Sequence, residues 1–222
     1  MKKIITLITK IKYLKIMSIE WKISSSPIEY QDAINFMEER IKLIHNNQAN
    51  ELVWFLEHPS IYTAGTSAKE SDLLDKKFPI FNTGRGGQYT YHGPGQRVVY
   101  LMLDLRKRGE DLRKYIANLE NWIIASLNEI GLFSEKKTGR IGIWTNTKNG
   151  KEAKISAIGV RVRKWIAYHG IAINVSPNLE HYNGIIPCGI REFGVTSLHE
   201  LGYNISYEKL DNILKAKFSD FL

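Results

Sequence analysis

Apolar residues recur at the spacing of one helix face in three parts of the chain. Residues three or four positions apart lie on the same side of a helix, where they can be buried together. The three sets predict three helices, and Gly131 is the expected end of the second one. The apolar positions are Ile34, Met37, Ile41 and Ile44; Leu112, Ile116, Leu119, Ile123, Leu127 and Ile130; and Leu210, Ile213, Leu214 and Phe218 within residues 207–218.

The start of the first helix is predicted from a capping signal. Ser26 is followed by Pro27 and, three residues after the serine, by Glu29. A serine can cap the first turn, proline suits the first helical position, and the glutamate can bond back to the serine N–H group. We therefore expect this helix to begin at Ser26 and Pro27.

Short runs rich in strand-forming residues separate the predicted helices. They predict strands at 52–56, at 97–105 and at 165–175, and a pair at 141–145 and 154–162 joined by a turn at Asn149 and Gly150. Helices and strands do not alternate strictly, and several strands cluster between residues 140 and 175. The sequence therefore predicts an α+β fold, a mixed sheet with packed helices, rather than a doubly wound parallel sheet.

The length of 222 residues and the 43% hydrophobic content suit one domain, which we place at residues 17–222. The first residues begin like a signal peptide, but lysines interrupt the apolar run and no small-residue cleavage site follows. Residues 1–16 are therefore expected to be an extension outside the fold, with Met17 as a second possible start. No stretch approaches the ~18 apolar residues that span a bilayer. A single cysteine without an export signal favours the reducing cytoplasm.

The net charge of +8 and the pI near 9.4 imply a surface that attracts acidic partners. Nucleic acid, an anionic membrane and an acidic carrier protein all fit this description. The basic residues are spread along the chain, and neither zinc-finger spacing nor an aromatic RNA-binding signature accompanies them. Charge alone does not choose among the three partners.

The lone cysteine is the first candidate for chemistry. The sequence contains one cysteine, Cys188, so an intramolecular disulfide is excluded. This residue lies between Pro187 and Gly189. A thiol between a restricted and a permissive residue suits a nucleophile that a reactant can approach. Because free cysteine is also among the most buried residue types, a packing role is the alternative.

A glycine-rich run is the second candidate. Residues 83–96, the glycine segment, contain five glycines together with aromatic rings, hydrogen-bond donors and Arg85. So many glycines cost folding entropy, which favours a backbone brought close to a ligand over an unstructured surface loop. The run lacks the Gly-Lys-Ser/Thr ending of a Walker loop and the spacing of a dinucleotide fingerprint, so a phosphate cradle is disfavoured.

Lys154 is the third candidate, because it leads into a mostly apolar strand. By strand alternation it can share a side with Ser156 and Ile158. A desolvated lysine can accept protons, and a nearby ammonium can stabilise a thiolate. The alternative is a lysine at a strand edge that faces water, and the sequence by itself does not show that Lys154 reaches Cys188.

Together these segments resemble the lipoyl(octanoyl) transferases, also called octanoyl-carrier-protein:protein N-octanoyltransferases. The match runs in order and spacing from about residue 50 to residue 200, and the glycine segment is its most specific part. Its motifs are His58-Pro59, Tyr62-Thr63-Ala64-Gly65, residues 85–96, residues 154–161, residues 168–174, and Pro187-Cys188-Gly189.

The resemblance implies a biotin/lipoate protein ligase-like catalytic domain and an acyltransferase that moves an octanoyl group in protein lipoylation. It implies that Cys188 carries the acyl group as a thioester and that Lys154 lowers the pKa of this thiol and transfers protons. Neither a cofactor nor a metal is expected. The implied substrate-binding residues are Arg85, Gly86, Gly87, Gln88, Tyr89, Thr90, Tyr91, His92, Ala157, Ile158, Gly159, Gly170, Ile171 and Ala172. We expect the glycines at 159 and 170 to leave room for a narrow C8 tunnel, and Arg85 and His92 to organise the binding loop.

The implied donor is octanoyl-acyl carrier protein, whose acidity suits the basic charge of this chain. The implied acceptors are the lipoyl domains of 2-oxoacid dehydrogenase E2 subunits and the glycine cleavage H protein; neither nucleic acid nor a membrane is expected as a partner. Two alternatives stay open: an ATP-dependent lipoate or biotin protein ligase on the same fold, which would need no cysteine, and a basic nucleic-acid-binding protein that stacks bases on Tyr89 and Tyr91.

Overall fold

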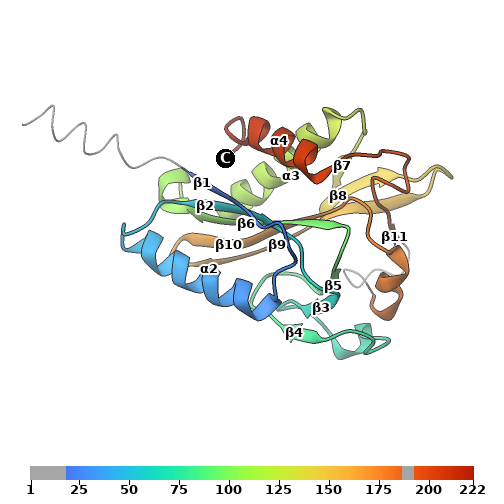
Figure 1. The fold of residues 1–222 in the computed structure, drawn as a ribbon, viewed down its shortest axis with the longest axis horizontal. Coiled ribbons are helices and arrows are strands. Elements are labelled where there is room, and N and C mark those ends of the chain that lie inside the picture. Colours follow the sequence, from blue (N-terminus) through green and yellow to red (C-terminus); the bar gives the residue numbers. More distant parts are fainter. Residues whose placement is uncertain (1–18, 187–192) are drawn as a thin grey trace, which may run out of the picture.

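A mixed eight-stranded sheet forms the centre of the fold within residues 19–186 and 193–222, the part of the chain that the computed structural model describes (Figure 1). Its strand order is β1-β2-β6-β10-β9-β8-β7, and the short β11 pairs with β9. The strands of this sheet are β1 (Glu20–Ile23), β2 (Leu52–Leu56), β6 (Gln96–Asp104), β7 (Glu135–Lys137), β8 (Arg140–Asn146), β9 (Glu152–Arg163), β10 (Ile166–Asn174) and β11 (Gly194–Val195).

A second, small sheet lies beside the large one and carries part of the glycine segment (Figure 1). Its order is β4-β3-β5, with β3 (Ile61–Ala64) parallel to β4 (Ile80–Asn82) and antiparallel to β5 (Tyr89–His92). Short 3₁₀ helices at Glu70–Asp72, Leu105–Arg108 and Leu179–Gly184 occupy connections between elements.

Helices cover both faces of the large sheet (Figure 1). Helix α2 (Tyr30–His45) packs Ala33, Met37 and Ile41 on one face, against apolar side chains of β2, β6 and β10. Helices α3 (Leu112–Asn128) and α4 (Tyr207–Phe218) cover the other face, where the largest core cluster lies. The two layers of core explain why β6 and β10 are buried along their whole length.

The predicted α+β class is confirmed, and each predicted helix and strand has a counterpart in the structure. The last helix has the predicted bounds, and β2 coincides with the predicted run at 52–56. The turn at Asn149 and Gly150 joins β8 to β9, with Gly150 at a φ of +73°.

The predicted start of the first helix was wrong. Helix α2 begins at Tyr30, and its N-cap is Glu29, which makes no side-chain capping bond. The backbone of Ile28 is engaged elsewhere, because its N–H donates to the Glu57 carbonyl and its carbonyl accepts from His58 Nδ1. These tertiary bonds hold the segment in an extended conformation and delay the helix past the local capping signal.

A buried ion pair joins the large sheet to α4. Arg97 of β6 and Asp211 of α4 are each about 3% exposed, and Arg97 Nε donates to Asp211 Oδ1 at 2.9 Å. The guanidinium also lies over the rings of Phe55 and Tyr207. The pair fixes the position of α4 on the core.

Replacing Asp211 by alanine is expected to lower the free energy of unfolding by about 3–5 kcal/mol, because the Arg97 guanidinium stays buried without its carboxylate. Urea denaturation measures the loss. Asn212→Ala, at the neighbouring exposed position, is the matched control and is expected to change stability by about 0.5 kcal/mol or less. An Asp211→Ala variant as stable as the control would contradict this role of the pair.

Candidate active site

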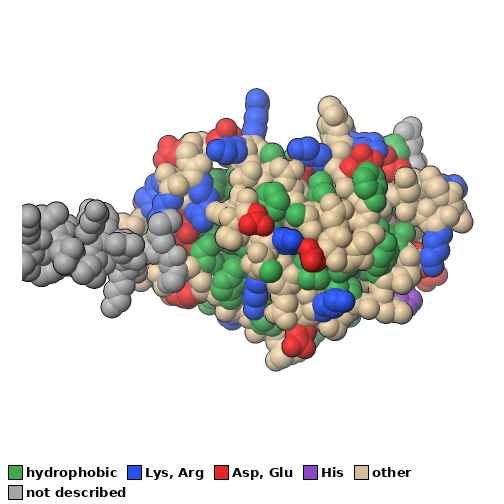
Figure 2. Space-filling view, turned by 90° about the horizontal axis from the view of Figure 1, so that it is seen from above, with side chains coloured by type: hydrophobic (Ala, Val, Ile, Leu, Met, Phe, Trp, Pro, Cys, Tyr) green, Lys and Arg blue, Asp and Glu red, His purple; other side chains and the backbone are tan. Residues whose placement is uncertain are grey.

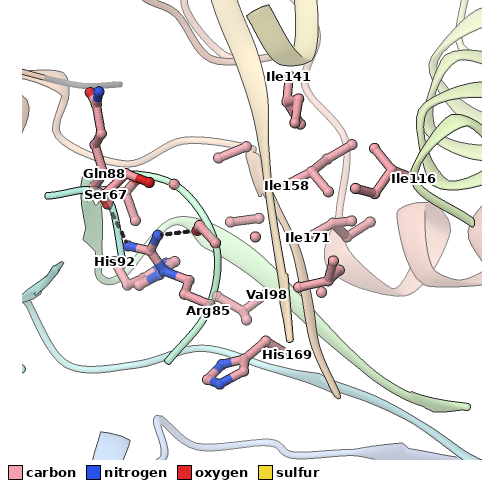
Figure 3. A pocket seen from close by; sticks show the side chains of 18 of the residues that line it. Ser67, Arg85, Gln88, His92, Val98, Ile116, Ile141, Ile158, His169 and Ile171 are labelled. Atoms are coloured by element: carbon pink, nitrogen blue, oxygen red, sulfur yellow. Dashed lines mark hydrogen bonds between the residues drawn. The ribbon is translucent and has the colours of Figure 1, made fainter. Parts of the chain in front are cut away.

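A pocket of about 440 Å³ lies where the glycine segment meets strands β9, β10 and β6 (Figure 3). Its wall is mostly apolar, with a few polar side chains among the lining residues. The lining comprises Tyr30, Ser67, Arg85, Gly86, Gly87, Gln88, Tyr89, Thr90, His92, Val98, Tyr100, Leu112, Ile116, Gly139, Ile141, Lys154, Ala157, Ile158, Gly159, Val160, His169, Gly170, Ile171 and Ala172.

The structure brings the predicted substrate-binding residues to this one pocket, with one exception. Tyr91 is fully buried in the apolar cluster of the small sheet, where its hydroxyl lies 3.0 Å from Ser60 Oγ and 2.9 Å from His181 Nδ1. It alternates with Thr90 and His92 along β5, which line the pocket. Tyr91 therefore supports the sheet that carries the lining residues.

The two ends of the pocket differ in exposure. Leu112 and Ile141 are 39% and 52% exposed and form an apolar mouth beside Ile116. Val98 and His169 lie at the buried end. Figure 3 shows the isoleucines on one side of the strands and Arg85, His92 and His169 on the other. The pocket can thus receive an elongated apolar group from outside.

Arg85 ties the glycine segment to its surroundings. Its NH2 group donates to the Thr63 carbonyl at 2.8 Å, to Thr63 Oγ1 at 2.6 Å and to the Gln88 carbonyl at 3.0 Å. The neighbouring Gly86 N–H donates to the Val160 carbonyl at 3.0 Å, which docks the segment on β9. These bonds hold the segment across both sheets.

The glycines at 159 and 170 serve close packing, contrary to the expectation that they leave a tunnel open. A Cβ at Gly159 would lie 2.8 Å from Cδ of Arg85, so the arginine occupies that space. A Cβ at Gly170 would lie 2.2 Å from the Val99 carbonyl oxygen of β6. Both distances are shorter than real Cβ contacts, so these glycines let the arginine and a neighbouring strand approach closely.

Three buried histidines lie at or near the closed end of the pocket. His58 Nδ1 lies 2.6 Å from the Ile28 carbonyl and must donate to it, so His58 Nε2 accepts from the Tyr100 hydroxyl at 2.7 Å. His92 Nδ1 likewise donates to Gln96 Oε1 at 2.6 Å, because the Gln96 amide nitrogen donates to Asn174 Oδ1 at 2.9 Å. The His92 ring therefore presents Nε2 as its acceptor.

All three histidines are held neutral. Burial lowers the pKa of His58 to about 4. Burial also lowers the pKa of His92 to about 3, with a further contribution from His58. The pKa of His169 falls to about 3 by burial and then by the charges of Arg85 and Arg161. His92 and His169 line the pocket, where their rings can accept or donate hydrogen bonds at neutral pH without carrying a charge.

His169 is a functional candidate that sequence reasoning left out of the site. It sits inside β10 with a φ of +59°, a conformation that non-glycine residues rarely adopt and that often marks functional sites. Its ring stacks on Tyr168 and meets the edge of Tyr100. The available signal was its place next to Gly170; the backbone conformation has no sequence signature.

Lys154 is buried and lines the pocket. The alternative of a lysine at a strand edge that faces water is therefore wrong. The Lys154 side chain is 6% exposed, Nζ donates to the Ile141 carbonyl at 3.0 Å, and the Trp144 ring centroid lies 4.7 Å from Nζ. A bulge places Ile155 as an extra residue between the pairs of β9 with β8, which interrupts simple alternation. Lys154 and Ile158 line the pocket, whereas Ser156 Oγ donates to the Ala172 carbonyl.

Cys188 lies outside the described residues, and its predicted role stays a prediction. The chain is placed on either side of it. Ile186 N–H donates to the Asp72 carbonyl at 2.8 Å. Val195 of β11 pairs with Lys154 of β9, so the chain after residue 192 returns next to this lysine.

Charges of both signs are interspersed on the face that carries α3 and α4 (Figure 2). This face does not present a continuous basic stripe of the kind that tracks a nucleic-acid backbone. No helix in residues 19–186 and 193–222 has the length and apolar character to cross a membrane. Within the same residues, His, Asp and Glu side chains do not gather into a group suited to hold a metal ion.

Comparison with known proteins gives the same fold and a specific family. A family model described as the lipoyl protein ligase A/B catalytic domain matches residues 29–219. Among solved structures, a bipartite lipoate protein ligase from Thermoplasma acidophilum has a TM-score of 0.64 at 14% identity, covering 93% of this chain and 83% of that chain. A lipoate-protein ligase A bound with ATP has a TM-score of 0.66 at 15% identity, covering 91% and 85%. These likenesses confirm the predicted ligase-like fold.

Curated relatives are much more similar in sequence. The octanoyltransferase of Paramagnetospirillum magneticum is 55% identical over 203 residues, which is 91% of this chain and 96% of the relative. The octanoyltransferase of Wolbachia from Brugia malayi is 56% identical over 201 residues, or 90% and 98%. This chain belongs to the lipoyl protein ligase A/B catalytic-domain family, and these relatives at 55% and 56% identity are octanoyltransferases, as the sequence motifs predicted.

The neutral histidines predict that the protein loses stability in mild acid. In the unfolded chain each imidazole has a pKa near 6.5, well above its folded pKa of about 3 or 4. The unfolded state therefore binds more protons as the pH falls from about 6.5 toward 4, and each histidine removes about 1.4 kcal/mol of stability per pH unit in that window. Urea denaturation at a series of pH values measures this slope.

His92→Gln removes one of these groups and is expected to flatten the slope by about a third of the histidine contribution. His199→Gln is the control, because His199 is exposed. Parallel curves for the parent and His92→Gln would contradict the assignment of neutral, buried histidines.

Proposed function

We propose that this protein is an octanoyltransferase that moves an octanoyl group from octanoyl-acyl carrier protein to the lysine amine of a lipoyl domain in protein lipoylation. The observation that carries the proposal is the identity of about 55% to octanoyltransferases over nine-tenths of the chain and of its relatives. The pocket supports it, because a mostly apolar cavity with a few polar groups suits an acyl chain with one reactive end.

The acyl chain is proposed to enter at the apolar mouth and extend toward the buried end of the pocket. Ile158 and Ile171 flank this path, and Val98 lies at its end. Burying a methylene group contributes roughly 0.8 kcal/mol, so the seven carbons behind the carbonyl contribute roughly 6 kcal/mol of binding. The carbonyl carbon is then proposed to remain near Lys154, at the mouth.

In the proposed mechanism the Cys188 thiolate attacks the carrier thioester. The new carbon–sulfur bond forms as the bond to the carrier thiol breaks, and the thiol leaves after it gains a proton. One thioester replaces another, so the acyl group stays activated and ATP is not required. The acceptor amine then attacks the Cys188 thioester, loses a proton, and forms the amide as the Cys188 thiol is released.

Lys154 is proposed to assist both steps. An ammonium beside a thiol favours its thiolate, and an amine within reach of the acceptor can take its proton. The burial of Lys154 in the pocket and the return of β11 beside it support this role. His92 and Arg85 are proposed to shape the binding surface without taking part in covalent chemistry.

The proposed partners follow from the same chemistry. An acidic donor carrier would be drawn to a protein of charge +8, which speeds encounter at low salt. The lipoyl domains of 2-oxoacid dehydrogenase E2 subunits and the glycine cleavage H protein are the proposed acceptors. Residues 17–222 are proposed as the catalytic domain and residues 1–16 as an extension. We place the reaction in the cytoplasm, where a single thiol stays reduced.

Mixing the protein with octanoyl-acyl carrier protein, without ATP, is expected to produce an octanoyl adduct that hydroxylamine removes. Intact-protein mass spectrometry detects the adduct, and Cys188→Ser is expected to abolish it because the serine hydroxyl is a much weaker nucleophile at neutral pH. Addition of a lipoyl domain should discharge the parent adduct onto one lysine of that domain.

The ATP-dependent ligase predicts a different result. It would leave the parent without an adduct, and it would acylate the lipoyl domain only when free octanoate and ATP are supplied. That outcome, with full activity in Cys188→Ser, would contradict the transferase proposal.

A further inference from the structure

Two rows of pocket residues run across the neighbouring strands β9, β10 and β6. Residues two positions apart on a strand point to the same face of a sheet, so both rows lie on one side of it. The rows follow from the register of the three strands, and every member lines the pocket. The first row is Ala157, Ala172 and Val98, and the second row is Gly159, Gly170 and Tyr100.

The first row has the length of an eight-carbon chain. Neighbouring strands lie roughly 4.8 Å apart, so this row spans roughly 10 Å from Ala157 to Val98. The seven carbon–carbon bonds of an extended octanoyl chain, each about 1.5 Å long, span roughly 9 Å. Lys154 belongs to β9, the strand of Ala157. An octanoyl group whose carbonyl lies at this end of the row therefore ends at Val98.

The second row adjoins a group of buried polar rings. Tyr30, His92, Tyr100 and His169 line the pocket and come from α2, β5, β6 and β10. The Tyr100 ring centroid lies 6.0 Å from that of His169 and 5.7 Å from that of His58. The His58 centroid lies 6.0 Å from that of His92 and 5.3 Å from that of Tyr30. We call the space between the four pocket-lining rings the polar chamber.

His169 has hydrogen-bonding capacity that the fold does not use. It is 3% exposed, and within residues 19–186 and 193–222 neither of its ring nitrogens has a hydrogen-bond partner. His92 bonds Gln96 through Nδ1, which leaves Nε2 as an acceptor toward the pocket. A buried polar group without a partner is costly, and its φ of +59° adds backbone strain to His169. Such a ring in a pocket wall indicates that a bound group completes its hydrogen bonds.

Val98 lies between the apolar path and the polar chamber. Figure 3 shows Val98 between Ile171 and His169, so a chain that runs past the isoleucine meets the valine before the histidine. Carbons beyond the eighth have to pass Val98 and enter the chamber. A methylene group there makes no hydrogen bond, and it displaces the water that could bond the ring nitrogens.

We propose that His169 is a specificity-determining residue: the polar chamber takes water or a hydroxyl group, and it rejects unsubstituted acyl chains longer than eight carbons. The chamber holds water when an octanoyl chain ends at Val98, and it holds the hydroxyl of a chain that is two carbons longer and carries that group at its end. The consequence for transfer rests on the proposed function, because it concerns the acyl group that the enzyme moves.

Octanoyl, decanoyl and 10-hydroxydecanoyl thioesters of acyl carrier protein test the chamber in the parent protein. The decanoyl donor is expected to have a kcat/KM roughly 10-fold below that of the octanoyl donor, because its last carbons leave the ring nitrogens unpaired. The 10-hydroxydecanoyl donor is expected to recover at least about 3-fold of this loss, since its hydroxyl can bond the rings.

Variants at one position separate polarity from shape. His169→Met fills the site without a polar hydrogen and is expected to raise the decanoyl-to-octanoyl ratio of kcat/KM roughly 10-fold. His169→Gly also removes the ring, adopts a positive φ without strain, and is expected to raise the ratio in the same direction. His169→Asn keeps a polar group and tolerates this φ, so its ratio is expected within about 3-fold of the parent.

Tyr168→Phe is the matched control, because Tyr168 is the buried neighbour of His169 and does not line the pocket. It is expected to keep the parent ratio. Circular dichroism and thermal melting establish that each variant is folded. A parent that uses decanoyl as well as octanoyl, or a parent-like ratio in the folded His169→Met or His169→Gly variant, would overturn the proposal. An equal rise in His169→Asn would overturn it too.

A second readout does not depend on acyl transfer. In protein labelled with ¹⁵N-histidine, the ring resonances of His169, assigned by their disappearance in His169→Asn, are expected to shift when 10-hydroxydecanoate binds and to move much less with octanoate. Binding of 10-hydroxydecanoate that leaves these resonances in place would overturn the role of His169. If the parent forms no acyl adduct while the resonances respond as expected, the transferase proposal fails and the chamber stands.

Discussion

The docking of the glycine segment on strand β9 is the constraint on which the pocket depends. The Gly86 N–H bonds the Val160 carbonyl, and the Arg85 guanidinium reaches Thr63 in the small sheet. Two adjacent residues thereby join the small sheet to strand β9 of the large one, one through its backbone and the other through a buried side chain. Because the pocket wall consists of backbone and side chains from both sheets, it exists only when this contact is made.

Close packing of backbone then determines where glycine is required. At Gly159 the missing Cβ makes room for Arg85, and at Gly170 it makes room for strand β6. The ionisable groups inside this tight arrangement are hydrogen-bonded or held neutral. The histidines at the closed end follow that rule, since burial lowers the pKa of each ring far below neutrality. Lys154 follows it in another way, through the Ile141 carbonyl and the Trp144 ring.

The helices and long strands could be predicted because their apolar periodicity reflects burial against one common sheet. The start of α2 could not, since tertiary bonds to Ile28 outweigh the local signal at Ser26. The glycine segment was predicted as a binding loop from its composition, but its strand β5 was missed among the glycines. The reason for Gly159 was also missed, because the side chain that fills its space comes from a residue more than seventy positions earlier.

The candidate site could also be predicted only in part, because some of its features depend on tertiary packing. The family motifs pointed to the lining residues contributed by the glycine segment, β9 and β10. Leu112 and Ile116 were recognised as apolar positions of a helix, and nothing in their spacing distinguishes a pocket mouth from a core. The positive φ of His169 arises from tertiary packing and has no local sequence signature.

The central claim is that this pocket holds the acyl chain with its reactive end at Lys154. A crystal structure of the protein after reaction with an octanoyl thioester tests it most directly. The account predicts an acyl chain between the glycine segment and strands β9 and β10, with its carbonyl within hydrogen-bond distance of Lys154 Nζ and its methyl end toward Val98. An octanoyl group bound elsewhere, with the pocket empty in the acylated protein, would contradict the account.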